Sequence, residues 1–378
     1  MPAPIIPLVD VFVEIPDFRQ KQGKRYALSA ILALACAAIL CGYRSYSAIA
    51  EWGRNYGESL ALALGFKRGE TPCAATLPTI FRHLDTEQFE ARLGQWAESV
   101  LQAQPAGTEA LEGVAVDGKT QRGSAKQGAS GAHLLSPVSP RLGLPLAQQA
   151  IRDKSNELGH IQEVLDELIL KGKVITTDAL HTQRQVAQTI VDNGGDYLMI
   201  AKENQPQLRT DIEILFQEPQ VVAETLTQAC TIESGPGRIE ERRLTASSAL
   251  VGYIDWPGHQ QVFRLERTVT IKKTRVQRQE VTYGITSLSP QRADAARLLR
   301  LDRRHWRVEA THWIRDVTFD EDRSQVRCGH VAEVMAALRN LAIARLRLAG
   351  ETNIAAACRR LAAQPWAALA LIGINPEN

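Results

Sequence analysis

Two aspartates follow short apolar stretches that have the character of buried β-strands. Asp117 comes directly after Val114–Val116, and Asp178 comes directly after Lys173–Thr177. In an α/β sheet, ligands and catalytic groups collect at the ends of strands, and carboxylate oxygens suit Mg²⁺ or Mn²⁺. The two positions therefore indicate a divalent-cation site, although an aspartate after a strand is more often a turn former or a helix cap.

A third acidic candidate lies far downstream, on a helix predicted over Arg303–Ile314. Polar residues recur there at i, i+4, i+7 and i+11 and so share one stripe: His305, Glu309, His312 and Asp316. Trp306 and Trp313 lie beside this stripe, which is unusual for a merely solvated face. An exposed amphipathic helix is the alternative. A zinc site formed by His305, Glu309 and His312 matches no standard ligand spacing.

Basic residues are frequent near these acids and would hold a polyanion by its phosphates. Those close to the predicted strands are Lys119, Arg122, Lys154 and Lys202, and the downstream ones are Lys272, Lys273, Arg275, Arg297, Arg300, Arg304 and Arg307. The last four are spaced to share one side of a helix that leads to Glu309. For any single one of them, a solvated surface charge is the simpler interpretation.

The composition excludes several classes of protein. The chain has 378 residues, of which 44% are hydrophobic and 23% charged, which rules out a disordered tail, a collagen-like repeat and a mucin-like stalk. A formal charge of +2 excludes a uniformly basic coat protein. The six cysteines form no C-x-x-C signature, which favours reduced thiols in the cytoplasm. The apolar run Ala27–Cys41 is too short to span a bilayer and is expected to be a buried helix.

The predicted order of elements in the middle of the chain is β-β-β-α-β-α-β-α. Strands are expected at Val114–Val116, Ala132–Val138, Leu144–Ile151, Lys173–Thr177 and Tyr197–Ile200, and helices at Glu157–Lys171, Thr182–Asn193 and Pro206–Phe216. Three opening strands imply a meander, and the later β-α units imply parallel pairing with right-handed crossovers. This order indicates a ribonuclease-H-like mixed sheet. A Rossmann domain would have a helix and a glycine fingerprint after its first strand.

Helices dominate the chain before this α/β core, and strands dominate it afterwards. We predict a lead-in segment over 1–26, a helical N-terminal domain over 27–104, the first part of the core over 110–229, a β-rich insertion over 230–288, a helical second part of the core over 289–349 and a tail over 350–378. Strands of the insertion are expected at Ile239–Leu244, Gln261–Leu265, Thr268–Lys272 and Glu280–Ser287.

The helical N-terminal domain is a candidate DNA-binding module. Thr71–Leu84 would supply the recognition helix of a helix-turn-helix, with Arg82 and His83 exposed. An ordinary helical bundle is the alternative, because bundles without a DNA-binding motif are common.

Five segments together resemble one protein family. They are V-A-V-D-G-K-T-Q-R-G-S (114–124), D-K-S-N-E-L (153–158), V-I-T-T-D-A-L-H-T-Q (174–183), G-G-D-Y-L-M-I-A-K-E-N-Q (194–205) and H-W-R-V-E-A-T-H-W-I-R-D-V-T-F-D-E-D-R-S (305–324). Over nearly its whole length, the chain is similar to bacterial insertion-sequence DDE transposases of the ISAs group, also called H-repeat-associated proteins. The similarity includes the helical module around Ile15–Leu84 and the closing segment M-A-A-L-R-N-L-A-I (335–343).

This resemblance implies a ribonuclease-H-like catalytic core with a β-rich insertion before the final acid. It implies Asp117 as the first acid, Asp178 as the second and Glu309 as the third, and two bound Mg²⁺ or Mn²⁺ ions. Because each acid must reach a metal pair about 4 Å apart, we expect the three carboxylates within about 8 Å of one another. The implied substrate is double-stranded DNA, both element ends and target, bound by a homodimer that needs no nucleotide cofactor and no membrane.

The sequence departs from the related larger group of insertion-sequence transposases around the third acid. His305 stands where that group has Arg, Asp316 stands where it has Lys, and Val308-Glu309-Ala310 replaces a common Ile-Glu-Asn. In some related transposases an aromatic residue in the insertion stacks on a flipped base, which makes Trp256 a candidate DNA contact. A turn-anchoring core tryptophan is the alternative for this residue.

Two other functions stay open at this point. One is a metal-dependent nuclease or resolvase that does not perform strand transfer, and the other is a catalytically silent DNA-binding remnant. The presence of all three acids argues against the remnant. We expect the protein in the bacterial cytoplasm, associated with the nucleoid.

Overall fold

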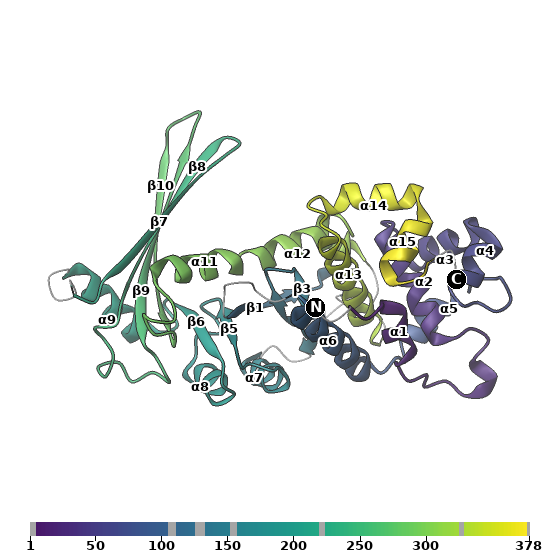
Figure 1. Cartoon of the computed structure of the whole chain (residues 1–378), viewed down its shortest axis with the longest axis horizontal. Coiled ribbons are helices and arrows are strands. Elements are labelled where there is room, and N and C mark those ends of the chain that lie inside the picture. Colours follow the sequence, from purple (N-terminus) through teal and green to yellow (C-terminus); the bar gives the residue numbers. More distant parts are fainter. Residues whose placement is uncertain are drawn as a thin grey trace. The chain divides into compact units, whose positions relative to one another are not determined.

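The computed structural model describes residues 5–104, 111–124, 133–151, 157–218, 224–324 and 329–375 (Figure 1). The chain forms two compact units. The first unit comprises Met1–Pro105, Gly118–Ser155 and Val308–Asn378, and the second unit comprises Ala106–Asp117 and Asn156–Arg307.

The second unit contains a mixed sheet whose order is β1-β5-β6-β10-β9-β8-β7. Its parallel part consists of β1 (Glu112–Thr120), β5 (Lys173–Thr177) and β6 (Asp196–Ala201). The helices along this part of the chain are α7 (Glu157–Glu167), α8 (Arg184–Asp192) and α9 (Pro206–Gln217). Strands β5 and β6 are buried on both faces, which explains why they appear in the sequence as continuous apolar runs.

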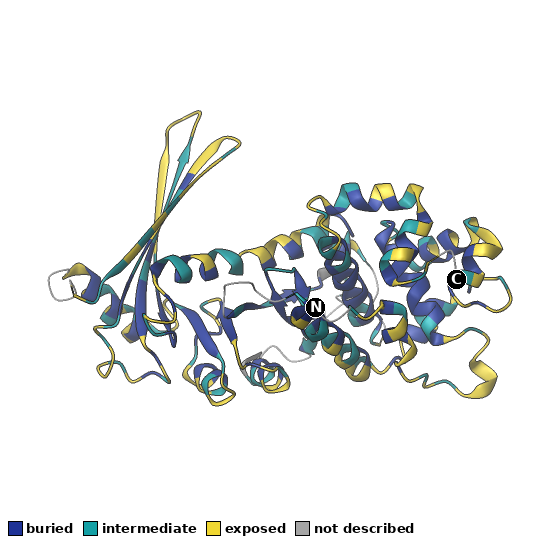
Figure 2. Cartoon of the chain, viewed as in Figure 1, coloured by how far each residue is buried: buried dark blue, intermediate teal, exposed yellow. Residues whose placement is uncertain are grey.

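The β-rich region extends this sheet. Its four strands are β7 (Thr227–Gly235), β8 (Arg238–Ser247), β9 (Gln261–Ile271) and β10 (Gln277–Thr286), all antiparallel, and β10 pairs with β6. At this junction Gly284 is required, because a Cβ there would collide with the Phe263 ring and would lie 2.5 Å from the Met199 carbonyl oxygen. Strands β7–β8 and β9–β10 form two hairpins, which we call the ribbons. Figure 2 shows that their outer ends are exposed.

Two strand predictions in this region were wrong. Gln261–Leu265 and Thr268–Lys272 form one strand, β9, because the charged residues between them are paired across strands: Arg267 contacts both Glu240 and Glu280. Such cross-strand pairs stabilise a strand that the sequence pattern alone would break. Strand β7 was not predicted.

Helix α11 (Ala295–His305) covers one face of the sheet (Figure 1). It begins after Asp294, whose carboxylate accepts a hydrogen bond from the Arg297 amide at 2.8 Å. Its apolar side packs against strand residues in one core cluster: Val174, Leu198, Leu244, Phe263 and Leu265 on the strands, and Leu298, Leu299 and Leu301 on the helix. The predicted start of a new helix at Arg303 is therefore wrong. The helix continues to His305, and α12 (Arg307–Val317) follows Trp306.

The first unit combines helices with the other end of β1. The helices are α1 (Leu8–Val13), α2 (Leu28–Leu40), α3 (Tyr46–Asn55), α4 (Gly57–Ala63), α5 (Thr76–Phe81), α6 (Thr86–Ala103), α12 (Arg307–Val317, which starts at the unit boundary), α13 (Val331–Leu348), α14 (Ile354–Ala363) and α15 (Pro365–Ile372). The lead-in thus contains a helix, and the segment predicted as a tail contains two. Both corrections have the same cause, because these helices bury their apolar sides against α2.

Helix α2 is long and apolar enough to pass a test for a membrane span, together with the turn before it (Lys21–Leu40). Nearly all of its side chains are buried inside the helical part of the first unit, however, and its neighbours are α1, α3, α13, α14 and α15. This confirms the predicted buried helix. Cys36 and Cys41 lie in the same apolar core, whereas Cys73 and Cys230 are exposed; Cys328 lies outside the described residues.

In the first unit, β1 has β2 (His133–Ser139) as its neighbour, and β2 pairs antiparallel with β3 (Leu144–Pro145) and β4 (Gln149–Ile151). The single strand predicted over Leu144–Ile151 is split, because Pro145 has no amide hydrogen for the ladder and the Leu146 amide turns to the Pro137 carbonyl at 2.8 Å. Along the sheet, the order β3-β2-β1-β5-β6 is that of a ribonuclease-H-like core, as predicted.

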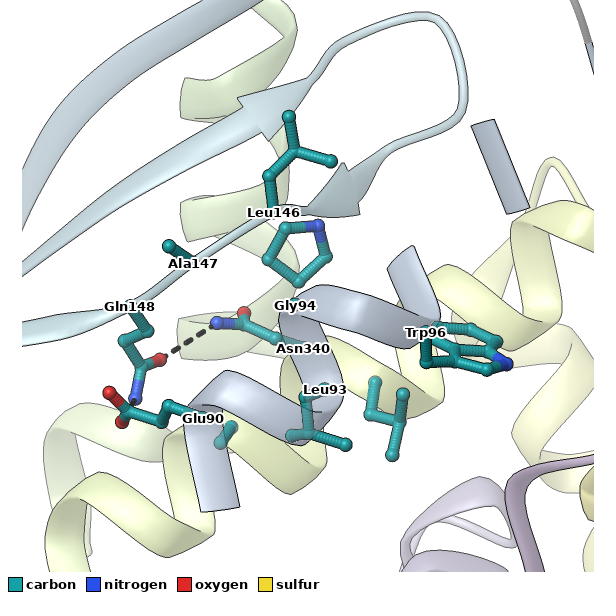
Figure 3. Close-up of a pocket in the computed structure, with 11 residues that line it drawn as sticks. Glu90, Leu93, Gly94, Trp96, Leu146, Ala147, Gln148 and Asn340 are labelled. Atoms are coloured by element: carbon teal, nitrogen blue, oxygen red, sulfur yellow. Dashed lines mark hydrogen bonds between the residues drawn. The ribbon is translucent and has the colours of Figure 1, made fainter. Parts of the chain in front are cut away.

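Buried amides attach α6 to this strand edge (Figure 3). Gln148 Nε2 donates to Glu90 Oε1 at 3.0 Å, and Asn340 Nδ2 donates to Gln148 Oε1 at 3.0 Å. Gly94 allows the close approach, since a Cβ there would lie 2.8 Å from the Leu146 carbonyl oxygen. The residual cavity is about 30 Å³, the size of a single water molecule, so this contact is structural.

Candidate active site

The strand register brings the first two predicted acids together. Strands β1 and β5 are parallel and pair from Glu112 with Lys173 up to Val116 with Thr177, so the next step places Asp117 opposite Asp178. Neighbouring strands lie about 4.8 Å apart, and paired residues of parallel strands point to the same face. The two carboxylates are therefore neighbours on one face of the sheet.

That face is the one covered by α11. A Cβ on Gly113 would lie 3.2 Å from the Leu301 side chain, and Val174, the partner of Gly113, belongs to the core cluster beneath α11. Since side chains alternate along a strand, Asp117 and Asp178 point to the α11 side as well. Asp117 lies within β1, which continues to Thr120, and not after the strand as the sequence predicted.

Asp178 is held as a carboxylate by a buried histidine. Its side chain is about half exposed (49%), and its Oδ1 lies 3.0 Å from Nδ1 of His181, which is only 2% exposed. The His181 backbone amide also donates to this oxygen at 3.3 Å. Partial burial raises the pKa of Asp178, but the hydrogen bonds and charge of His181, with a smaller effect of His305, lower it below its ordinary value.

His305, the last residue of α11, belongs to the same face. Its Nδ1 lies 3.0 Å from Oγ1 of Thr176, which precedes Asp178 by two residues on β5. Burial lowers the pKa of His305 below its usual value, although Asp178 partly offsets this, so the ring is neutral at neutral pH. His181 and His305 were not identified as partners of Asp178 in the sequence, although the i, i+3 spacing of Asp178 and His181 after a strand was a usable signal.

Glu309 lies in the first turn of α12, in the first unit, and is exposed. The flanking Trp306 and Trp313 are 52% and 61% exposed. Within the described parts of the chain, no three His, Cys, Asp or Glu side chains are gathered into a metal-binding group. The third acid therefore stays a prediction, and a zinc site at His305, Glu309 and His312 receives no support.

Lys119, predicted to contact DNA, is instead part of a buried ion pair in the first unit. Its side chain is 8% exposed, and its Nζ lies 2.7 Å and 2.6 Å from the two carboxylate oxygens of Asp316. Asp322 Oδ1 is a more distant neighbour at 4.0 Å. Asp316 was one of the departures from the pattern of the related larger group, and the structure gives it a cation from a segment almost two hundred residues away.

A second buried ion cluster lies beside this pair. Glu321 is 1% exposed and accepts from Arg315 at 2.8 Å and from Arg339 at 3.0 Å. Burial raises the pKa of Glu321, but the two guanidinium groups outweigh this and lower it. His312 has a pKa of about 3 because of burial and the charges of Arg315 and Lys119, so it is neutral.

The remaining predicted DNA contacts fall into three groups. Lys202, Lys272, Lys273, Arg275, Arg300 and Arg307 are exposed, and Arg297 and Arg304 are partly buried. Only the backbone of Arg122 is described, and Lys154 lies outside the described residues. Trp256 is 6% exposed, which favours its alternative role as a turn-anchoring core residue.

Asp302 on α11 gives a prediction about pH. It is 4% exposed, and burial raises its pKa from 3.8 to about 6, although Arg242 lowers it in part. Between about pH 4 and pH 6 the folded chain keeps a proton that the unfolded chain releases, so this residue reduces stability as pH rises through that window. We expect Asp302→Asn to be close to wild type at pH 4 and more stable by roughly 3 kcal/mol at pH 7.

Urea unfolding of the two proteins across pH 4 to 7 measures this difference directly. A gap in unfolding free energy that does not change with pH would show that Asp302 is not the titrating group.

The comparisons with known proteins show which family the chain belongs to. Residues 9–97 match the family model described as DDE_Tnp_1-associated, and residues 108–345 match the Transposase DDE domain. Putative transposase YncI of Escherichia coli O157:H7 is 30% identical over 350 residues, which are 90% of this chain and 87% of that protein. H repeat-associated putative transposase YhhI of Escherichia coli (strain K12) is 30% identical over 339 residues, 87% of each.

Among solved structures, a piggyBac transposase synaptic complex with hairpin DNA is similar at 9% identity. The match covers 96% of this chain and 76% of that chain with a TM-score of 0.42, a likeness too low to support an argument.

Proposed function

Because the chain belongs to the family of transposases with a DDE domain, we propose that it cuts DNA at the ends of an insertion sequence and joins those ends to target DNA. One observation carries the proposal for this chain: the register that makes Asp117 and Asp178 neighbours on a single face of the sheet. Two adjacent carboxylates on one face of a sheet are what a site for hard divalent cations requires.

The proposed metal ligands are Asp117, Asp178 and Glu309. When bound, two Mg²⁺ or Mn²⁺ ions would activate the attacking hydroxyl and relieve charge on the leaving oxygen. Both aspartates fit this role, because they are adjacent and the pKa of Asp178 is below its ordinary value. Glu309 is proposed from the resemblance of its segment and from its exposure in the first turn of α12.

The chain's own side chains prepare this site. His181 orients the Asp178 carboxylate through its ring and its amide, which is the kind of outer contact that fixes metal ligands. His305, neutral and bound to Thr176, lines the same face without adding a positive charge that would repel cations. The exposed cations Arg300 and Arg307, and Lys272–Arg275 in the β9–β10 turn, are proposed to hold DNA phosphates.

Two element ends must be brought together for transposition, so we propose that the chain acts as a homodimer on DNA, in the cytoplasm where bacterial DNA lies. The full-length chain should nick or cut duplexes carrying candidate element ends only with Mg²⁺ or Mn²⁺, and it should join pre-cleaved ends to a target plasmid.

Mapping the cut strands distinguishes the candidate functions. Cleavage without joining would contradict the transposase proposal and indicate a nuclease or resolvase. End binding without any metal-dependent cleavage would leave a DNA-binding remnant.

A further inference from the structure

The helical part of the first unit contains a basic hollow that the catalytic proposal does not use. Its volume is about 460 Å³, and three segments form its walls: Phe12, Val13, Ile15 and Asp17 of the first, Lys24–Ser29 of the second and Gly65–Arg68 of the third. Four exposed cations line it: Lys24, Arg25, Lys67 and Arg68. The hollow lies far along the chain from Asp117, Asp178 and Glu309, and its lining carries more basic than acidic side chains.

The nearby acids do not neutralise these cations. Asp17 pairs with Arg19, whose Nε and Nη2 donate to its two carboxylate oxygens at 2.9 Å each. The Nζ of Lys24 lies farther away, 3.8 Å from Oδ2 of Asp17. Glu70 pairs with Arg25 at 3.4 Å, but both side chains are more than half exposed, so this pair is weak. Lys67 and Arg68 have no ion pair within the described residues. Lys24, Lys67 and Arg68 are therefore left without a strong counter-charge.

Aromatic contacts hold the walls of the hollow in place. The Tyr26 and Phe66 rings meet edge to face at 5.7 Å and so join the second and third segments. The Arg25 guanidinium lies 5.3 Å from the Tyr26 ring centroid, within cation–π range. These contacts hold the two segments that carry the four cations against each other.

The start of α2 adds to the positive field at the same place. Ala27, Leu28 and Ser29 line the hollow, and no side chain caps this helix of 13 residues. The first amides of a helix lack partners within the helix and, together with the helix dipole, favour an anion. The four cations and the N-terminus of α2 therefore both attract an anion.

We propose that this hollow binds the sugar-phosphate backbone of DNA, and that it is the surface by which the helical module engages the element end. The choice of DNA among anionic partners rests on the proposed function. The surface replaces the predicted recognition helix at Thr71–Leu84, where only Thr76–Phe81 is α-helical and Leu77, Ile80 and Phe81 face the core. Although Arg82 and His83 are exposed as predicted, six helical residues span only about 9 Å.

The test uses the full-length chain with Lys67→Gln and Arg68→Gln combined, and Arg54→Gln as the control. Arg54 is an exposed cation near the end of α3, outside the hollow. Affinity for a labelled end duplex and for an unrelated duplex is measured by fluorescence anisotropy from about 50 to 200 mM salt. Circular dichroism melting confirms that all variants fold.

We expect the double variant to bind both duplexes more weakly, with the salt slope smaller by about two, one for each lost phosphate contact. Arg54→Gln should match wild type. An unchanged slope and affinity in the folded double variant would overturn the proposal, as would an equal loss in Arg54→Gln.

This binding assay is separate from the joining assay. If the wild-type chain joins ends but the salt slope of the double variant is unchanged, the proposed role of the hollow is wrong and the proposed transposase function stands. If the salt slope of the double variant is smaller but the wild-type chain shows no metal-dependent cleavage, the hollow binds DNA and the proposed transposase function is wrong.

Discussion

Asp117→Asn should abolish strand cleavage while leaving binding to the element end nearly unchanged. Asparagine keeps the size of the side chain but removes the negative charge that a divalent cation needs. Charge stabilisation by metal ions contributes several kcal/mol to the transition state, so we expect cleavage to slow by roughly a thousand-fold or more. Binding rests on Lys and Arg contacts to phosphates, which this change does not alter.

The matched variants for this experiment are in the same unit. Asp178→Asn should cause a similar loss, and the double variant should be little worse than either single one, because groups that act together are not additive. Asp192→Asn, an exposed carboxylate at the end of α8, should cut DNA at the wild-type rate. If Asp117→Asn loses binding and cleavage together while still folded, the acid has a structural role.

Glu321→Gln should be the most destabilising conservative change in the first unit. Glu321 is the shared acceptor of two arginines, Arg315 and Arg339, whose side chains are 1% and 2% exposed. Removing its charge leaves two guanidinium groups buried without a counter-ion, and breaking a buried pair in this way costs about 3–5 kcal/mol. Chemical denaturation followed by far-UV circular dichroism gives the change in unfolding free energy.

Asp320→Asn is the control for this prediction, one position away. Asp320 reaches Arg323 only at 3.7 Å and is 38% exposed, and asparagine tolerates its left-handed backbone (φ 53°). Its loss should change the unfolding free energy by less than about 1 kcal/mol. If Glu321→Gln is as mild as this control, the cluster is not the stabilising contact that its burial indicates.

The features that the sequence predicted correctly are those with a local signal. Buried parallel strands are largely apolar, so β5 and β6 could be located, and Asp178 at the end of β5 followed from this. The order of strands and helices then left few topologies, and the ribonuclease-H-like sheet was one of them. His181 also had a local signal, its spacing of three residues from Asp178 after a strand.

The features that were missed depend on partners distant in the chain. Lys119 was predicted to meet DNA because it follows an acid, but its partner Asp316 is far away in sequence, and no pattern around either residue shows the pairing. The same holds for Glu321, whose partner Arg339 lies 18 residues away and which the sequence did not single out. The end of α11 at Trp306 was missed because tertiary packing of Leu298 and Leu301, and not helix propensity, decides where that helix continues.

The pairing of β10 with β6 makes the β-rich region impossible to remove cleanly. Without its four strands, β6 would become an exposed edge whose unpaired amides and carbonyls would invite other chains to add strands, and apolar residues such as Leu198 and Met199 lie along that edge. A shortened chain intended to isolate the catalytic core should therefore aggregate, whereas trimming only the exposed outer ends of the ribbons should be tolerated. Natural variation in the length of this region is accordingly expected at the ribbon tips and not at their bases.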